Sequence, residues 1–359
     1  MRKIKAAIIS LGSVSSKWTY EAMKKYFDIV DFINIKDIEI RLGLKQSILY
    51  KGKSLEEYDC IYIKGSYRYS PVLRSIASLL PEKTFTPINA DAFTIGHDKL
   101  ITHQKLQVAD IPMPITYIAP TTDSAKMLLK NADYPILFKF PQGTQGKGVM
   151  YAESFASANS MLDALTAMKQ PFLIQEYIET GGSDIRAFVI GDKVVASMMR
   201  TAQEGDKRSN LHSGGKGHAI KLDQLTEAVA IKTAKTIGCG ICGVDILLGS
   251  MGPKVIELNL SPSLQGITAA TKVDIADKIA KYLFEKTKEI VEKDTNSQTK
   301  EVLKNHGISN LESKDIISKL DFRGNRILLP EIISKISKFN DSEEYVIKVD
   351  KDKINIKKM

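Results

Sequence analysis

The sequence has few of the features that mark the most easily recognised classes of protein. It has only three cysteines in 359 residues, which argues against a disulfide framework. No apolar run approaches the roughly 18 residues of a membrane span, and the run 6–9 is too short for the core of a signal peptide. We therefore expect a protein that stays in the cytoplasm and has no membrane partner.

The sequence also has no concentrated charge. Lys and Arg number 51 against 42 Asp and Glu, a net charge of +9, and both signs are interleaved along most of the chain. Nucleic-acid-binding proteins usually carry a basic stripe or a recognisable module, and neither is present, so we expect no direct nucleic-acid binding. The charge fits anionic small-molecule substrates or a basic surface. Cys239 and Cys242 form a CxxC without further zinc ligands, which favours buried cysteines over a metal or redox site.

The length of 359 residues suggests about two or three domains. The spacing of apolar residues predicts an α/β protein. The chain up to about Ala92 alternates short apolar strands with a helix, which is typical of an open α/β lobe. A single helix is expected over 94–110, and two strands then flank a glycine-rich turn. From about Gly182 the pattern changes to hairpins, and the last stretch, 344–358, alternates like a further hairpin.

The hairpin over 243–261 carries acidic residues in an otherwise apolar stretch. If its turn is centred on Met251, antiparallel pairing places Asp245 opposite Glu257, with Asn259 two residues further along the same face. Hard divalent cations prefer such oxygen donors. The alternative is a solvated face with incidental acids. The apolar residues between the acids favour metal binding, because they predict one face in a core and the other lining a site.

The segment PQGTQGKGV, residues 141–149, has three glycines, and such a loop can bring backbone N–H groups around phosphate oxygens. Lys139, two residues before it, adds a cation. A plain hairpin turn is the alternative. Neither a Walker A motif nor a GxGxxG after a first strand is present, so a phosphate site here would be of another kind.

Two further segments contain candidate binding residues. The strand LIQEYI, 173–178, has polar atoms at its edge that could contact adenine, although by itself this pattern favours an ordinary sheet strand. Three arginines crowd one region with an asparagine and a histidine, and arginines bind carboxylates and phosphates bidentately. A solvated basic loop is the alternative for any one of them. These residues are Arg186, Arg200, Arg208, Asn210 and His212.

Together these motifs resemble the RimK-type ATP-grasp ligases over essentially residues 1–290. The match runs in order through SILYKGKSL, HDKL, LFKFPQGTQGKGV, LIQEYIETGGSDIRAFVIGDKVVA, EGDKRSNLHSGG, GVDIL, VIELNLSPSLQGI and VDIA. The resemblance implies an ATP-grasp fold of the α/β (α+β) class. The expected parts are a Rossmann-like pre-ATP-grasp lobe over 1–93, a small lobe with a glycine-rich lid over 94–181, a metal-binding lobe over 182–293, and a C-terminal extension of unknown role over 294–359.

The resemblance also implies a reaction. An ATP-dependent ligase of this family forms an acyl phosphate and adds an amino acid, with glutamate favoured, to a protein C-terminus or a coenzyme glutamyl tail. ATP and two Mg²⁺ or Mn²⁺ ions are the implied cofactors, and self-association of the chain stays open. The alternatives are a ligase acting on an amino-group carrier protein in lysine or arginine synthesis, and a non-catalytic nucleotide-binding scaffold.

By the same resemblance, individual residues take roles in three groups. The ATP phosphates would contact Lys99 and Lys139 under a lid that includes Gly143, Gly146 and Gly148, and the base and ribose would contact Gln175, Glu176, Tyr177, Ile178 and Asp184. The metal ligands would be Asp245, Glu257 and Asn259, with Glu257 bridging two ions. The acyl phosphate or the substrate carboxylates would contact Arg186, Arg208 and Asn210.

Three places depart from the pattern of the family. The chain reads SPSLQG where SPGLEG is usual, HSGG where HRGG is usual, and Met199–Arg200 where an acidic residue precedes the arginine. The first two changes place Ser263, Gln265 and Ser213 at positions where the family has a glycine, an acid and an arginine. Changes of charge around one site leave the amino acid and the acceptor undetermined.

Overall fold

The computed structural model describes residues 2–43, 47–143, 148–202, 216–305, 321–324, 326–328, 337, 340, 342–351 and 353–358. Contacts divide the chain into two compact units, Met1–Thr295 and Asn296–Met359, which are described separately. Three residues with predicted roles, Gly146, Arg208 and Asn210, lie outside the described residues, and their roles stay predictions.

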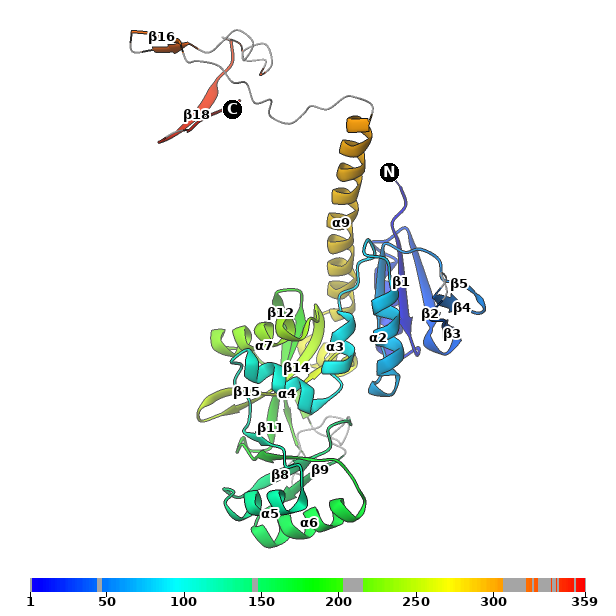
Figure 1. Ribbon diagram of the computed structural model, residues 1–359, viewed down its shortest axis with the longest axis vertical. Helices are drawn as coiled ribbons and strands as arrows, with labels where there is room; N and C mark the ends of the chain where they lie inside the picture. The colour runs from blue at the N-terminus through cyan, green and yellow to red at the C-terminus, as the bar shows by residue number, and fades with distance from the viewer. Residues whose placement is uncertain are drawn as a thin grey trace. The chain divides into compact units, whose positions relative to one another are not determined.

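The N-terminal part of the first unit is built on a small parallel sheet (Figure 1). Its elements are β1 (Lys5–Ser10), α1 (Val14–Met23), β2 (Ile29–Asn34), η1 (Ile35–Asp37), β3 (Ile38–Ile40), β4 (Ile48–Tyr50), β5 (Lys53–Ser54), β6 (Cys60–Ile63), η2 (Tyr67–Tyr69), α2 (Ser70–Leu79) and α3 (Ala90–Ile95). The sheet order is β2–β1–β6, with both pairings parallel, and β3, β4 and β5 form a separate antiparallel sheet. Because parallel strands end at the same edge, Ser10 and Lys64 meet at one edge of the first sheet.

The single helix predicted over 94–110 is wrong, because the chain forms two helices there. The first, α3, ends at Ile95, and α4 (Lys99–Val108) begins four residues later. The carboxylate of Asp98 accepts hydrogen bonds from the backbone N–H groups of Leu100 at 2.9 Å and Ile101 at 3.1 Å. This N-cap starts a new helix and places Lys99 in its first turn.

The second sheet is antiparallel and carries two helices. Its elements are β7 (Thr116–Tyr117), α5 (Thr122–Lys130), β8 (Ile136–Lys139), β9 (Val149–Ala152), α6 (Phe155–Ala167) and β10 (Leu173–Glu176), with the strands in the order β7–β10–β8–β9. Both helices begin with capping boxes, at Thr121 and Ser154, which explains where they start. Their apolar faces pack on Phe138 in a small core of their own, so this sheet is covered by α5 and α6 (Figure 1).

The third sheet is the largest and carries most of the candidate site. Its elements are β11 (Ser183–Ile190), β12 (Lys193–Thr201), β13 (Lys216–Ala219), α7 (Gln224–Ile237), β14 (Ile241–Gly249), β15 (Gly252–Asn259), α8 (Gln265–Thr271) and α9 (Ile275–Asn305). The strands are antiparallel in the order β13–β12–β11–β14–β15. Helix α7 ends at Gly238, whose φ of 80° is the left-handed conformation that glycine adopts most readily.

The predicted pairing of Asp245 with Glu257 is confirmed, but the predicted centre of the turn is wrong. Gly249 pairs with Gly252, so the turn has two residues and is centred between Ser250 and Met251. A β-bulge between residues 245 and 246 shifts the register by one residue and restores the predicted partners. Without the bulge, the two acidic side chains would lie on opposite faces.

The second unit contains two short hairpins within its described residues. One pairs β16 (Asp321–Arg323) with β17 (Arg326–Leu328), and the other pairs β18 (Tyr345–Asp350) with β19 (Lys353–Lys358). The second hairpin was predicted from the alternating sequence over 344–358. In the part of the chain that the structure describes, no helix is both long and apolar enough to cross a membrane.

Candidate active site

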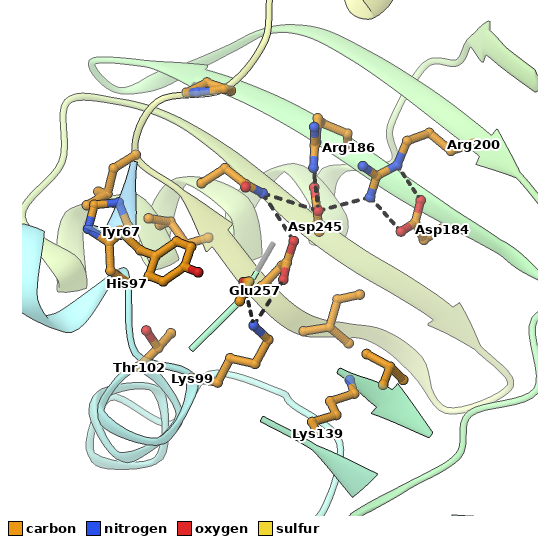
Figure 2. A pocket seen from close by; sticks show the side chains of 18 of the residues that line it. Tyr67, His97, Lys99, Thr102, Lys139, Asp184, Arg186, Arg200, Asp245 and Glu257 are labelled. Atoms are coloured by element: carbon orange, nitrogen blue, oxygen red, sulfur yellow. Dashed lines mark hydrogen bonds and ion pairs between the residues drawn. The ribbon is translucent and has the colours of Figure 1, made fainter. Parts of the chain in front are cut away.

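A cavity of about 870 Å³ lies in the first unit, bordered by elements of all three large sheets (Figure 2). Most of the predicted site residues that the structure describes line it: Lys99, Lys139, Gly143, Gln175, Glu176, Tyr177, Ile178, Asp184, Arg186, Asp245, Glu257 and Asn259. Gly148 is not among the residues that line the cavity. It has a φ of 82°, and its carbonyl accepts from the N–H of Phe140 at 3.0 Å.

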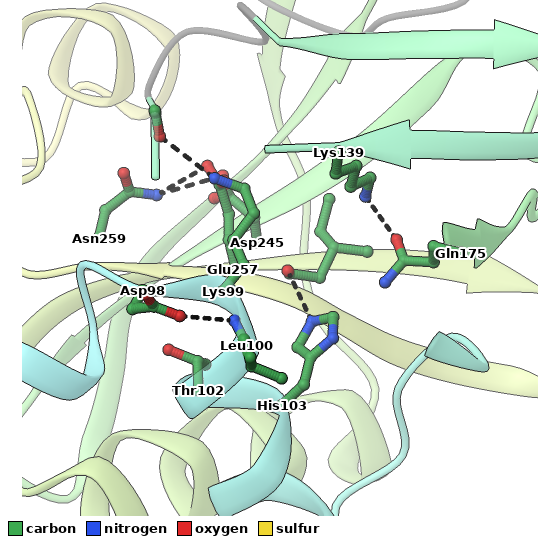
Figure 3. A network of polar contacts seen from close by, with 12 residues as sticks. Asp98, Lys99, Leu100, Thr102, His103, Lys139, Gln175, Asp245, Glu257 and Asn259 are labelled. Atoms are coloured by element: carbon green, nitrogen blue, oxygen red, sulfur yellow. Dashed lines mark hydrogen bonds and ion pairs between the residues drawn. The ribbon is translucent and has the colours of Figure 1, made fainter. Parts of the chain in front are cut away.

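The bulged hairpin brings the three predicted metal ligands together (Figure 3). The amide nitrogen of Asn259 donates to Asp245 Oδ2 at 3.3 Å and to Glu257 Oε1 at 3.4 Å. From the other side, Lys99 Nζ lies 3.8 Å from Glu257 Oε2 and donates to the carbonyl of Gly143 at 3.2 Å. The first glycine of the glycine-rich segment is thus connected through a lysine to the carboxylates.

Behind these residues lies a buried network of arginines and aspartates. Arg186 donates to both oxygens of Asp245, at 2.7 and 2.6 Å. Arg200 donates to both oxygens of Asp184, at 2.6 and 2.5 Å, and also lies 2.9 Å from Asp245 Oδ2. Sequence reasoning grouped the arginines with the anionic substrate. In the structure Arg186 and Arg200 neutralise acidic residues of the site itself, and their contact with a substrate stays a prediction.

The pKa values of the two aspartates in this network are shifted in opposite directions. Burial opposes the ionisation of Asp245, but the charges of Arg186 and Arg200 outweigh it and hold the pKa of Asp245 well below its usual range. Burial raises the pKa of Asp184 to about 6, against the attraction of Arg200. Asp184 was predicted to contact the ribose. Both of its carboxylate oxygens accept hydrogen bonds from Arg200. This arrangement favours a role for Asp184 in positioning Arg200.

A second polar chain runs from Lys139 into the sheet (Figure 3). Lys139 Nζ donates to Gln175 Oε1 at 2.5 Å, and Gln175 Nε2 donates to Thr116 Oγ1 at 2.8 Å. Burial lowers the pKa of Lys139 to about 8. The side chain of Gln175 therefore orients the lysine, and its predicted contact with adenine stays a prediction.

The side chain of Glu176, which was predicted to lie near the base, also accepts hydrogen bonds within the protein. Its Oε1 accepts from Lys254 Nζ at 2.6 Å and from the N–H of Ile115 at 2.9 Å. These bonds tie β10 to β15 and to the segment before β7. Tyr177 and Ile178 follow at the end of β10, where they line the cavity.

The oxygen atoms of Asp245, Glu257 and Asn259 suit a hard divalent cation. The carboxylates of the ion-pair network, however, are already matched by cations of the protein. Within the described residues, the ion-pair network joins three carboxylates and three cations: Asp184, Asp245, Glu257, Arg186, Arg200 and Lys99. Among the described residues no three His, Cys, Asp or Glu side chains converge as a metal site. Magnesium is often held by one or two carboxylates together with substrate phosphates. Glu257 and Asn259 fit that arrangement, with Asp245 sharing its oxygens with the arginines.

His103 joins the helix that carries Lys99 to the strand that carries Glu257. One ring nitrogen contacts Thr116 Oγ1 at 3.0 Å, and the other lies 3.2 Å from the carbonyl of Ile256, next to Glu257. The side chain is 4% exposed, and burial lowers its pKa to about 4. The histidine is therefore neutral at pH 7.

The buried His103 should make the protein sensitive to acid. Its pKa is lower in the folded state than in the unfolded chain, so its contribution is complete above about pH 6.5 and is lost as the pH falls toward 4. From this shift we expect a loss on the order of 2 kcal/mol by pH 4.5. Urea unfolding at pH 7.5 and 4.5 should show a smaller difference for His103→Gln than for the wild type. The exposed His218→Gln is the matched control, and equal differences in all three proteins would contradict the prediction.

Comparison with solved structures defines the class of the fold. The ATP-grasp ligase PsnB, solved with a minimal precursor, Mg and ADP, superposes with a TM-score of 0.63 at 17% identity, covering 79% of this chain and 98% of that one. A RimK domain protein ATP-grasp from Sphaerobacter thermophilus superposes with a TM-score of 0.60 at 18% identity, covering 78% and 99%. The fold is therefore the ATP-grasp fold.

Sequence relatives narrow this class to one family. The model of the RimK-like ATP-grasp domain matches residues 96–283. A probable alpha-L-glutamate ligase of Thioalkalivibrio sulfidiphilus is 41% identical over 246 residues, covering 67% of this chain and 80% of the relative. One of Shewanella loihica is 40% identical over 275 residues, covering 75% and 89%. The chain belongs to the RimK-like ATP-grasp family, and the protein is an ATP-grasp ligase that forms C–N bonds.

Sequence reasoning missed one wall of the cavity. This wall comes from the N-terminal sheet and the turn before α4, and its members are Ser10, Ser13, Ser16, Lys64, Tyr67 and His97. Figure 2 shows Tyr67 and His97 across the cavity from Arg186. A signal was available, because Lys64 is a charged residue directly after the wholly apolar strand CIYI, at the edge where parallel strands bind ligands.

Proposed function

We propose that the protein is an ATP- and Mg²⁺-dependent ligase that activates a carboxylate as an acyl phosphate and joins it to the amino group of glutamate. The acceptor carboxylate belongs to a protein C-terminus or to the glutamyl tail of a coenzyme. Membership of the family and relatives named as probable alpha-L-glutamate ligases support this assignment. The observation that carries it is that Lys99, Glu257 and Asn259 meet in a single cavity beside the glycine-rich loop.

The residues of the cavity suit phosphoryl transfer. Lys99, at the start of α4, and Lys139, at the end of β8, place two ammonium groups beside the carboxylates, where they can neutralise charge on transferring phosphate oxygens. Tyr177 and Ile178 line the same cavity and are the residues we assign to the base. No side-chain nucleophile is needed, because the substrate carboxylate is itself the attacking group.

Glu257 and Asn259 would hold Mg²⁺, with Asp245 as a shared third ligand. Bound there, the metal would supply charge neutralisation for the phosphates. Because Arg186 and Arg200 already balance the aspartates, we propose that Mg²⁺ binds together with the nucleotide rather than before it. Two ions per site, and Mn²⁺ as a substitute, are part of this proposal.

The amine then attacks the acyl phosphate, forming the C–N bond and releasing phosphate. Arg186, whose guanidinium lies in the cavity wall, is assigned to position the acyl phosphate while it is bound to Asp245. Arg208 and Asn210 have the same proposed role and lie outside the described residues.

The test is ADP release by the purified protein with ATP, Mg²⁺, a cell extract freed of its own ATPases, and each amino acid in turn. Mass spectrometry of the products should show a gain of one or more glutamyl units on a protein or a coenzyme. A mass gain from another amino acid would support the ligase assignment and contradict the assignment of glutamate as the substrate. No ADP release with any amino acid would contradict the ligase assignment for this chain.

A further inference from the structure

Lys64 is a buried cation that none of the roles above uses. It directly follows β6, is 3% exposed and lines the cavity. Within the part of the chain that the structure describes, its ammonium nitrogen has no hydrogen-bond partner. The centroid of the Tyr62 ring lies 5.4 Å from it. The ammonium thus lies just behind the cavity surface, against an aromatic face.

The charge of Lys64 is poorly compensated by the protein. Burial lowers its pKa to about 8, so the side chain is still mostly protonated at pH 7. An aromatic face offsets only part of the desolvation of an ammonium group, and it supplies no hydrogen-bond acceptor. A buried polar group without a partner calls for an explanation, and a ligand in the adjoining cavity is one.

The surroundings of Lys64 favour an anion. All four acidic residues that line the cavity come from β10, β11, β14 and β15, and none comes from the N-terminal sheet. Next to Lys64 the wall consists of Ser10 at the end of β1 and Ser13 and Ser16 at the start of α1. Ser13 caps α1, accepting from the N–H of Ser16 at 3.2 Å, so the positive end of the helix dipole lies at the cavity.

Hydrogen bonds hold this wall against the segment that follows β15. The N–H of Gly65 donates to Ser261 Oγ at 3.0 Å, and the N–H of Leu264 donates to Ser15 Oγ at 2.9 Å. Ser261 is two residues beyond Asn259. A molecule that reaches Lys64 therefore occupies the same cavity as the residues assigned to phosphoryl transfer.

We propose that Lys64 and the start of α1 bind a carboxylate of the substrate that does not itself react. The flexible stem of the lysine can turn its ammonium into the cavity to meet this group. The proposal rests on the proposed function, since it takes the substrates to be carboxylic acids. Two sources share this chemistry: the α-carboxylate of the incoming amino acid and a second carboxylate of the acceptor.

The test compares Lys64→Met and Lys64→Arg with the wild type in ADP release, with a glutamyl-glutamate dipeptide as acceptor. The amine is either glutamate or hydroxylamine, which converts an acyl phosphate to a hydroxamate and has no carboxylate. If Lys64 binds the incoming amino acid, Lys64→Met should raise the KM for glutamate at least about tenfold and leave turnover with hydroxylamine unchanged. If it binds the acceptor, the KM for the dipeptide should rise with both amines.

In either case Lys64→Arg should retain most of the affinity, because it keeps the charge. Unchanged KM values in Lys64→Met would overturn the proposal. So would an equal loss in both variants together with a lowered Tm, because that result indicates a structural lysine. Lys36→Met, at an exposed position on η1, is the matched control.

Failure of the proposed function would be recognised separately. If the wild type releases no ADP with either amine, calorimetric titration of glutamate and of the dipeptide still tests Lys64 directly. Weaker binding by Lys64→Met than by Lys36→Met would support the site, and equal binding would overturn it.

Discussion

Replacing Glu257 with glutamine should lower the rate of ADP release by about a thousandfold or more while the protein stays folded. The substitution removes the charge of the carboxylate that lies nearest to Lys99 and beside Asn259, with almost no change in volume. A bound metal ion stabilises transition-state charge by several kcal/mol, which would be lost with its charged ligand, and each 1.36 kcal/mol is a factor of ten in rate. Steady-state ADP release at saturating ATP and Mg²⁺ measures the effect.

Two controls make the result for Glu257 specific. Glu82→Gln is the same chemical change at an exposed position outside the cavity, and it should leave the rate unchanged. The Tm of Glu257→Gln should stay close to that of the wild type, because the side chain is 32% exposed. Wild-type turnover in Glu257→Gln would refute the assignment of Glu257 as a metal ligand.

Replacing Arg200 with methionine should destabilise the protein by about 3–5 kcal/mol, the usual effect of removing one partner from a buried ion pair. Arg200 is 6% exposed and bonds to both oxygens of Asp184. Without it, Asp184 must ionise with no counter-charge or take up a proton, and Asp245 keeps only Arg186. Urea unfolding at pH 7.5 measures the change in the free energy of unfolding.

The exposed pair between Arg74 and Asp91 offers the matched control. Arg74 donates to Asp91 at 2.8 Å, but both side chains are more than half exposed, so Arg74→Met should cost less than about 1 kcal/mol. The double variant Asp184→Asn, Arg200→Met should be more stable than Arg200→Met alone, because the second change removes the unpaired carboxylate. Strictly additive losses would show that the two residues are not coupled.

Much of the candidate site could be predicted because its residues lie in short ordered motifs. Asp245 and Glu257 could be paired from the spacing of one hairpin, since antiparallel strands pair residues symmetrically about their turn. That prediction succeeded because two errors cancelled. The turn is centred half a residue earlier than expected, and a bulge that no local pattern indicated restored the register.

The partners of the arginines could not be predicted in the same way. Arg186 and Asp245 lie 59 residues apart and meet only because β11 pairs with β14. Arg200 reaches both aspartates because it lies on β12, on the other side of β11. An arginine near a phosphate site is expected to bind the ligand. Only the order of the strands in the sheet shows that Arg186 and Arg200 form ion pairs with acidic residues.

The sequence by itself determined the family and the glycine-rich segment, because each depends on short motifs whose residues lie close together in the chain. The facing pair of acidic residues was predicted from the spacing of one hairpin, but it depends on a bulge that only the structure shows. The break between α3 and α4 also has a local cause, because Asp98 caps the start of α4. The spacing of apolar residues over 94–110 nevertheless predicted a single helix. Only the tertiary structure decided which charges neutralise one another and that Lys64 lies in the wall of the same cavity. The physical reason is that charge pairing and burial depend on distances between strands far apart in sequence, which no local pattern of side chains contains.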